Sequence, residues 1–107
     1  MKQKFYSFLQ DIPNSSKEEI FETIAKNESV RIERIISYGQ VSPKDFWYDQ
    51  DEDEFVIILD GNAEIEYDDG TKYKLSKGDS LYIDAHQKHK VVYTSNPAVW
   101  LAIFLAK

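Results

Sequence analysis

The chain has 107 residues, a formal net charge of −6 at neutral pH and no cysteine. This length is sufficient for one domain with one hydrophobic core, and the lack of cysteine excludes disulfides and thiolate metal sites. The acidic balance disfavours nucleic acid and anionic membranes as partners, because it repels phosphate groups. No apolar run approaches the ~18 residues that a membrane-spanning helix needs, so we expect a soluble, cytoplasmic protein.

The first clear pattern lies in residues 15–26. Ser16 and Glu19 have the spacing of a capping box, and four apolar residues then follow at helical intervals, namely Ile20, Phe21, Ile24 and Ala25. The pattern predicts a short amphipathic helix within an N-terminal extension, residues 1–29. Such a helix would cover the outside of a sheet, or alternatively bind a partner.

From residue 30 the periodicity changes to that of strands. Apolar and polar residues alternate in several short runs, and Asp69-Gly70 supplies the residues of a tight hairpin. The predicted strands cover residues 30–36, 55–59, 63–67, 73–75, 81–83, 90–94 and 99–105. Short strands of this number indicate an all-β domain over residues 30–107, either an antiparallel sandwich or a barrel.

Two stretches combine polar residues with an apolar strand. An acidic run at residues 47–54 leads into the strand 55–59, and residues 78–89 repeat the arrangement more weakly, ending in His89. Side chains that favour water or a cation are thus held against the core. We interpret the two stretches as opposite walls of one pocket.

These stretches also resemble the two sequence motifs of the cupins, a superfamily of metal-binding jelly-roll barrels. In the first motif a glutamate is followed by six residues and a glycine, as Glu54 is followed by Gly61. In the second motif a glycine precedes a histidine by ten intervening residues, as Gly78 precedes His89. The resemblance covers residues 30–105 and points to a small bacterial cupin whose jelly-roll barrel is preceded by the short N-terminal helix.

The two histidines of the first cupin motif are replaced in this chain. With three residues before Glu54 their positions fall on Tyr48 and Gln50, and with four they fall on Trp47 and Asp49. The second motif also differs, because Asp84 and His86 stand where cupins have proline and glycine, and Tyr93 replaces asparagine.

The resemblance implies a divalent transition metal held by Gln50, Glu54 and His89. One imidazole nitrogen and two oxygens would suit Mn, Fe, Ni or Zn and leave positions open for water or substrate. Asp49 is the spare carboxylate and His86 the spare imidazole, although His86 also fits a surface loop. Without a metal, Glu54 and His89 would form a hydrogen-bonded pair.

The implied function is binding of a small molecule in the barrel. We expect Trp47, Tyr48, Asp49 and His86 to border the pocket, and Glu54 is the candidate catalytic residue, either through the metal or as a general base. The sequence does not choose a reaction, since cupins include isomerases, oxygenases, lyases and plain binders. The alternative is a non-catalytic ligand-binding or sensing module without metal. A homodimer is expected, because exposed sheet edges and faces favour pairing.

Overall fold

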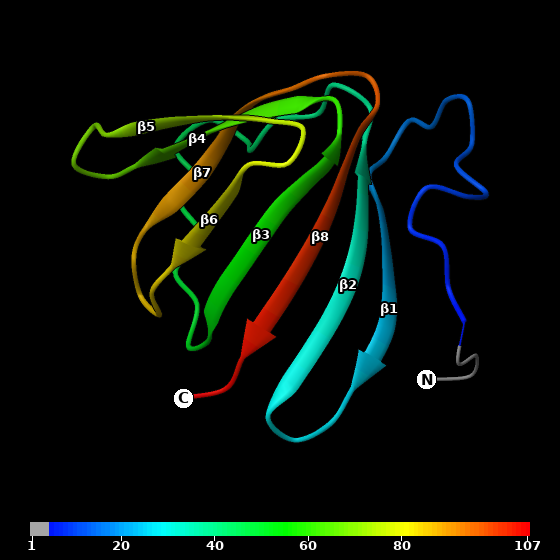
Figure 1. The fold of residues 1–107 in the computed structure, drawn as a ribbon. Coiled ribbons are helices and arrows are strands. Elements are labelled where there is room, and N and C mark those ends of the chain that lie inside the picture. The colour runs from blue at the N-terminus through cyan, green and yellow to red at the C-terminus, as the bar shows by residue number, and fades with distance from the viewer. Residues whose placement is uncertain (1–4) are drawn as a thin grey trace.

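The computed structural model describes residues 5–107, and these form eight strands in two antiparallel sheets (Figure 1). The large sheet has the order β1-β2-β8-β3-β6, and the small sheet has the order β5-β4-β7. The strands are β1 (Ile20–Lys26), β2 (Val30–Ser37), β3 (Asp53–Asp60), β4 (Asn62–Tyr67), β5 (Lys72–Ser76), β6 (Ser80–Ile83), β7 (His89–Thr94) and β8 (Ala98–Leu105). Every predicted strand is confirmed, and within residues 5–107 no helix is long and apolar enough to cross a membrane.

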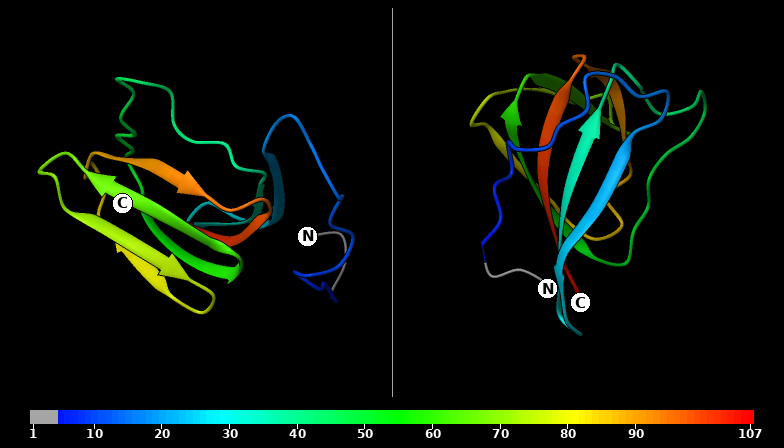
Figure 2. Two further views of the ribbon diagram at one scale, coloured as in Figure 1. Left: turned by 90° about the horizontal axis from the view of Figure 1, so that it is seen from above. Right: turned by 90° about the vertical axis from the view of Figure 1, so that its right-hand side faces the viewer.

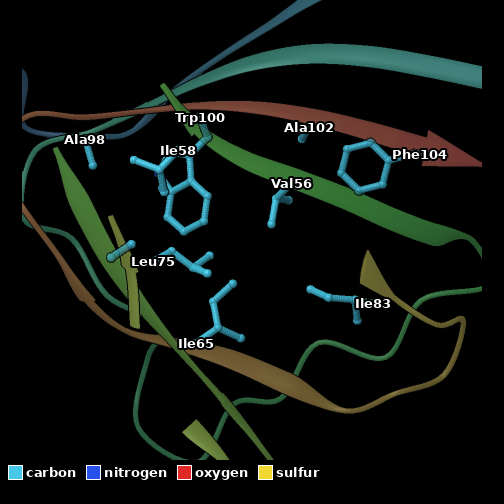
Figure 3. Packing of buried hydrophobic residues seen from close by; sticks show 10 residues of the cluster. Val56, Ile58, Ile65, Leu75, Ile83, Ala98, Trp100, Ala102 and Phe104 are labelled. Atoms are coloured by element: carbon cyan, nitrogen blue, oxygen red, sulfur yellow. The ribbon is translucent and has the colours of Figure 1, made fainter. Parts of the chain in front are cut away.

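The hydrophobic core lies between the two sheets. Val56 and Ile58 of β3 and Trp100 of β8 face Ile65 of β4 and Leu75 of β5 (Figure 3). Each of these side chains is at most 4% exposed, and burial of one aliphatic side chain of this size contributes roughly 1.5–3 kcal/mol. The core therefore provides a rigid wall for any group that projects from the neighbouring strand positions.

The large sheet reaches beyond the small one at its β1 end. Figure 2 shows β4, β5 and β7 toward the end of the large sheet that β3 and β6 form, away from β1, with the β2–β3 connection running beside β7. This connection is bonded along β7, because the Ser42 amide donates to the Val91 carbonyl (2.9 Å) and the Thr94 hydroxyl donates to the Gln40 carbonyl (2.7 Å). Residues 38–52 therefore continue the small sheet's side of a cavity whose other wall is the large sheet.

The helix predicted over residues 15–26 is wrong, because β1 occupies most of this segment. β1 pairs with β2 and contains a bulge between Thr23 and Ala25. The bulge adds one residue to the strand, so apolar pairs four positions apart imitate a helical period. Ser16 bonds to Glu18 in a local turn, and the Glu19 carboxylate accepts a hydrogen bond from Ser37 on β2 (2.5 Å).

The segment before β1 is fastened to the outer side of the large sheet. The Arg34 guanidinium on β2 is 3% exposed and donates to the carbonyls of Phe8 (3.1 Å) and Gln10 (2.6 Å). It also pairs with Glu22 on β1 at 2.6 Å. A buried guanidinium needs such partners, so Arg34 links the N-terminal segment, β1 and β2.

Asp53 is a buried carboxylate whose contribution to the stability of the fold depends on pH. It accepts hydrogen bonds from the Tyr82 hydroxyl (2.6 Å) and the Ala85 amide (2.7 Å), and Lys107 lies 3.1 Å away. These hydrogen bonds, Tyr82 first, lower the pKa of Asp53. Its contribution is complete above the unfolded-state pKa and is lost as the pH falls through the lower folded-state value. We expect Asp53→Asn to lower the melting temperature at neutral pH, with the difference from wild type vanishing in acid; a pH-independent difference would contradict this.

Candidate functional site

The candidate site is built around two buried side chains from opposite sheets. Glu54 is the second residue of β3, paired between Ile83 of β6 and Phe104 of β8, and it is 9% exposed. His89 opens β7 in the small sheet and is 5% exposed. Glu54 Oε1 lies 3.6 Å from His89 Nε2. Two residues thirty-five positions apart in the chain thus point at one another across the space between the sheets.

The hydrogen bonding of His89 fixes the role of each ring nitrogen. His89 Nδ1 lies 2.8 Å from the Gln87 carbonyl oxygen, and because a carbonyl only accepts, Nδ1 carries a proton. In a neutral imidazole, Nε2 would then direct a lone pair at the Glu54 carboxylate, which also only accepts. The arrangement is stable with a cation between the two groups, either a proton on Nε2 or a metal ion.

Burial and charge act in opposite directions on His89. Burial is the largest influence and lowers the pKa of the imidazole, but the Glu54 carboxylate and the Gln87 carbonyl together outweigh it, so the pKa is raised. When no metal is bound, the pair therefore favours imidazolium facing carboxylate.

Tyr48 and Gln50 reach the site from the β2–β3 connection. The backbones of Tyr48 and His89 form a bridge with N···O distances of 2.7 and 3.1 Å, and their rings stack 5.4 Å apart. Burial, with the charges of Glu19 and Glu54, raises the pKa of the Tyr48 hydroxyl. Two residues after Tyr48, the Gln50 carbonyl accepts a hydrogen bond from the His86 amide (2.7 Å), which holds the β2–β3 connection at a second point.

A cavity of about 170 Å³ encloses these groups. Glu54, His89, Tyr48 and Gln50 all line it. The remaining polar lining comes from Glu19, Glu33, Gln40 and Ser42, and the apolar lining from Phe21, Ile35, Val41, Pro43, Val56, Ile65, Ile83, Val91, Trp100 and Phe104. This volume suits a small molecule rather than a polymer.

The other three residues expected at the pocket lie elsewhere. The Trp47 ring packs under the Lys90 ammonium, whose nitrogen is 4.4 Å from the ring centre. His86 is exposed, with Nδ1 2.7 Å from Asp49 and Nε2 3.4 Å from Asp51. The lining of the cavity therefore does not include Trp47, Asp49 or His86. Of the two possible alignments with the first cupin motif, the one that uses Tyr48 and Gln50 places both residues at the cavity.

Sequence reasoning missed the residues that β1 and β2 contribute to the cavity. The helix predicted over residues 15–26 includes Glu19 and Phe21, and the strand predicted over residues 30–36 gives no signal for the side that Glu33 faces. In the structure Phe21 pairs with Ile35, and Glu33 pairs with Ala102 of β8, so all face the cavity side. The β-branched and aromatic content of residues 20–24 was the available signal for a strand.

The donor set limits what metal the site could bind. Among residues 5–107, no group of three or more histidine, cysteine, aspartate or glutamate side chains is arranged to hold a metal ion. Glu54 and His89 would supply the two strong donors, and a third protein donor would have to be the weaker Gln50 amide. His89 already has the second contact typical of metal-bound histidines, an Nδ1 proton donated to a backbone carbonyl.

The raised pKa of His89 predicts a pH dependence for the metal-free protein. Its stabilising contribution is complete below the unfolded-state value of about 6.5 and is lost as the pH rises through the folded-state value. We expect urea unfolding in EDTA to show this when His86→Asn is compared with His86→Asn/His89→Gln, because the background change removes the other imidazole. The difference in unfolding free energy should shrink as the pH rises from about 6.5 through the raised folded-state pKa of His89, and a constant difference would contradict the pairing.

Solved structures of similar fold include a protein from Ralstonia eutropha JMP134 described as a putative mannose-6-phosphate isomerase. It is 37% identical with a TM-score of 0.94, and the match covers 98% of this chain and 100% of that one. A cupin superfamily protein from Desulfitobacterium hafniense DCB-2 is 22% identical with a TM-score of 0.81, covering 98% and 94%. The DMSP lyase DddQ from Ruegeria pomeroyi DSS-3 is 18% identical with a TM-score of 0.65, covering 76% and 40%.

No curated protein has a significant match to the sequence. The family model of the cupin domain matches residues 34–104. This range contains β3 and β7, the strands that carry Glu54 and His89. Because the family model matches residues 34–104 and a cupin-fold protein is 37% identical over nearly the whole chain, the protein belongs to the cupin family.

Proposed function

We propose that the protein is a small-molecule-binding, metal-dependent cupin whose divalent ion is held by Gln50, Glu54 and His89. The observation that carries the proposal is that His89 Nε2 lies 3.6 Å from the buried Glu54 carboxylate, while His89 Nδ1 bonds to the Gln87 carbonyl. Two ligands at right angles on one metal, each about 2.1 Å from it, are roughly 3 Å apart. Only a small adjustment would therefore let an ion replace the proton between them.

The surrounding residues would prepare this site for chemistry. A bound divalent ion supplies a Lewis acid that polarises a carbonyl or activates water. The Gln87 carbonyl keeps the proton of His89 on Nδ1, and the stacked Tyr48 ring holds the imidazole plane. Glu54 could also take a proton from a substrate as a general base. Apolar side chains, including Trp100, form most of the remaining wall of the cavity.

The fold is compatible with more than one class of reaction. The Ralstonia eutropha protein is described as a putative isomerase and the Ruegeria pomeroyi protein as a lyase, and one fold can accommodate different reactions. A carboxylate and a polarising ion in one pocket would serve proton transfer next to a carbonyl, which both reaction types can use. The homodimer and the cytoplasmic location expected from the sequence stay predictions.

Metal analysis tests the proposal directly. We expect protein purified without chelator to carry about one transition metal ion per chain. After EDTA treatment, adding Mn²⁺ or Zn²⁺ at a hundredfold excess over Kd should stabilise the fold by about 2.7 kcal/mol, which raises the melting temperature by roughly 10 °C. A chain with no stoichiometric metal and an unchanged melting temperature would contradict metal dependence.

A metal-free binding or sensing module is the second candidate. It is favoured by the absence of a three-residue cluster of strong ligands within residues 5–107 and by the raised pKa of His89. An imidazolium–carboxylate pair can complete the site without an ion. In that case a small-molecule ligand should raise the melting temperature of EDTA-treated protein, whereas Mn²⁺ and Zn²⁺ should leave it unchanged.

A further inference from the structure

Three carboxylates line the cavity, and the imidazole that lines it, His89, faces one of them. Glu54 lies on one wall, and Glu19 and Glu33 lie on the wall formed by β1 and β2 and the residue before β1. Within residues 5–107, no lysine or arginine lines the cavity. A site that receives a phosphate or carboxylate group normally offers a guanidinium, an ammonium or a helix N-terminus, and none of these is found among the lining residues.

The cation beside the β2 wall is already neutralised. Arg31 Nε lies 2.9 Å from Glu33, and its two terminal nitrogens each lie 3.2 Å from the Glu52 carboxylate. Its guanidinium also stacks 4.2 Å from the centre of the Phe104 ring. Every nitrogen of Arg31 therefore contacts a carboxylate, so the side chain cannot turn to a ligand anion without breaking these bonds.

The β1–β2 wall is suited instead to hydrogen-bond donors or positive charge. The Glu19 carboxylate accepts one bond from Ser37 and retains further acceptor positions. Phe21 on the same wall is 59% exposed, and Tyr48 lies among the other lining residues. Carboxylates together with aromatic faces are the groups that favour ammonium ligands.

We propose that the pocket selects small molecules that present hydroxyl or ammonium groups to Glu19 and Glu33, and that it rejects phosphorylated and carboxylate ligands. This rests on the proposed function, in that the cavity must admit a small molecule, but it does not require a bound metal. An ion at Glu54 and His89 would leave the charges of the opposite wall in place. Mannose 6-phosphate is therefore a poor ligand for this chain.

Three sugars that share the mannose ring and differ in charge test the proposed ligand selectivity. Mannosamine, mannose and mannose 6-phosphate are titrated calorimetrically into EDTA-treated and Mn²⁺-loaded protein. We expect mannose 6-phosphate to bind at least tenfold more weakly than the better of the other two in both preparations. Equal or tighter binding of the phosphate would overturn the proposal. Failure of Mn²⁺ to bind would count against the metal site alone, since the comparison also runs in EDTA.

A second measurement does not require that any of the sugars binds to the protein. Trp47→Phe leaves Trp100, which lines the cavity, as the single tryptophan. The quenching constants of acrylamide, caesium and iodide for Trp100 are measured, and each is divided by the constant of the same quencher for free tryptophan amide. Caesium should quench several-fold more effectively than iodide, and Glu19→Gln/Glu33→Gln should raise the iodide constant several-fold. Equal effects of the two ions, an unchanged iodide constant in the double variant, or no quenching by any of the three would overturn the proposal.

Discussion

Glu54→Gln should lower the affinity for Mn²⁺ or Zn²⁺ by on the order of a hundredfold or more. The amide keeps the size of the side chain but removes the charge that balances the ion. It also removes the main influence that raises the pKa of His89, since burial then acts against the protonated ring. His89→Gln should have a loss of similar size. Calorimetric titration of EDTA-treated protein measures both.

The matched control is a second carboxylate–imidazole pair at the surface. Asp49 and His86 lie 2.7 Å apart but are 44% and 63% exposed, so solvent screens their charges and neither lines the cavity. Asp49→Asn/His86→Asn should leave the metal affinity within about twofold of wild type. If this double variant lost the metal while Glu54→Gln kept it, the ion would belong to the surface pair.

Gly61→Ala should destabilise the fold by about 3 kcal/mol. Gly61 joins β3 to β4 with φ +79°, a conformation that costs a side-chain-bearing residue energy. A Cβ there would lie 2.3 Å from Ser95 Oγ and 2.6 Å from the Pro97 carbonyl oxygen. Ser95 Oγ also accepts from the Asn62 amide and donates to Pro97, so the clash disrupts the contact between the β3–β4 turn and the β7–β8 turn. Urea unfolding measures the loss.

Gly70→Ala separates the energetic cost of a positive φ from the cost of the steric clash at Gly61. Gly70 has φ +93° in the β4–β5 hairpin, and a Cβ added there meets no atom within 4 Å. Its substitution should therefore cost only about 1 kcal/mol. Equal losses at Gly61 and Gly70 would show that the packing against Ser95 contributes nothing.

The sequence predicted the sheets well because each strand from β2 to β8 shows its own pattern. Alternation in β4 and β5 around Asp69-Gly70 specifies the hairpin, and the apolar run of β3 reflects its position between β8 and β6. β1 was missed because its bulge breaks the two-residue period. Its strand character depends on pairing with β2, a tertiary contact that local propensity does not contain.

The site was partly accessible to sequence reasoning for a similar reason. The spacings around Glu54 and His89 correspond to fixed positions on two strands, and both side chains line one cavity. The choice between Gln50 and Asp49 depended on the backbone bridge of Tyr48 with His89, which is known only from the fold. Glu19 and Glu33 enter the pocket through the register of β1 and β2, which spacing within one segment does not reveal.

The metal ion proposed between Glu54 and His89 is tested most directly by a crystal structure. The crystals are grown with Mn²⁺, and the anomalous scattering of manganese is measured. We predict one peak inside the cavity, about 2.0–2.3 Å from His89 Nε2 and from a Glu54 carboxylate oxygen, with the Gln50 amide oxygen turned toward it. An empty cavity in which His89 and Glu54 contact each other directly, with any manganese bound only at surface carboxylates, would contradict the metal site.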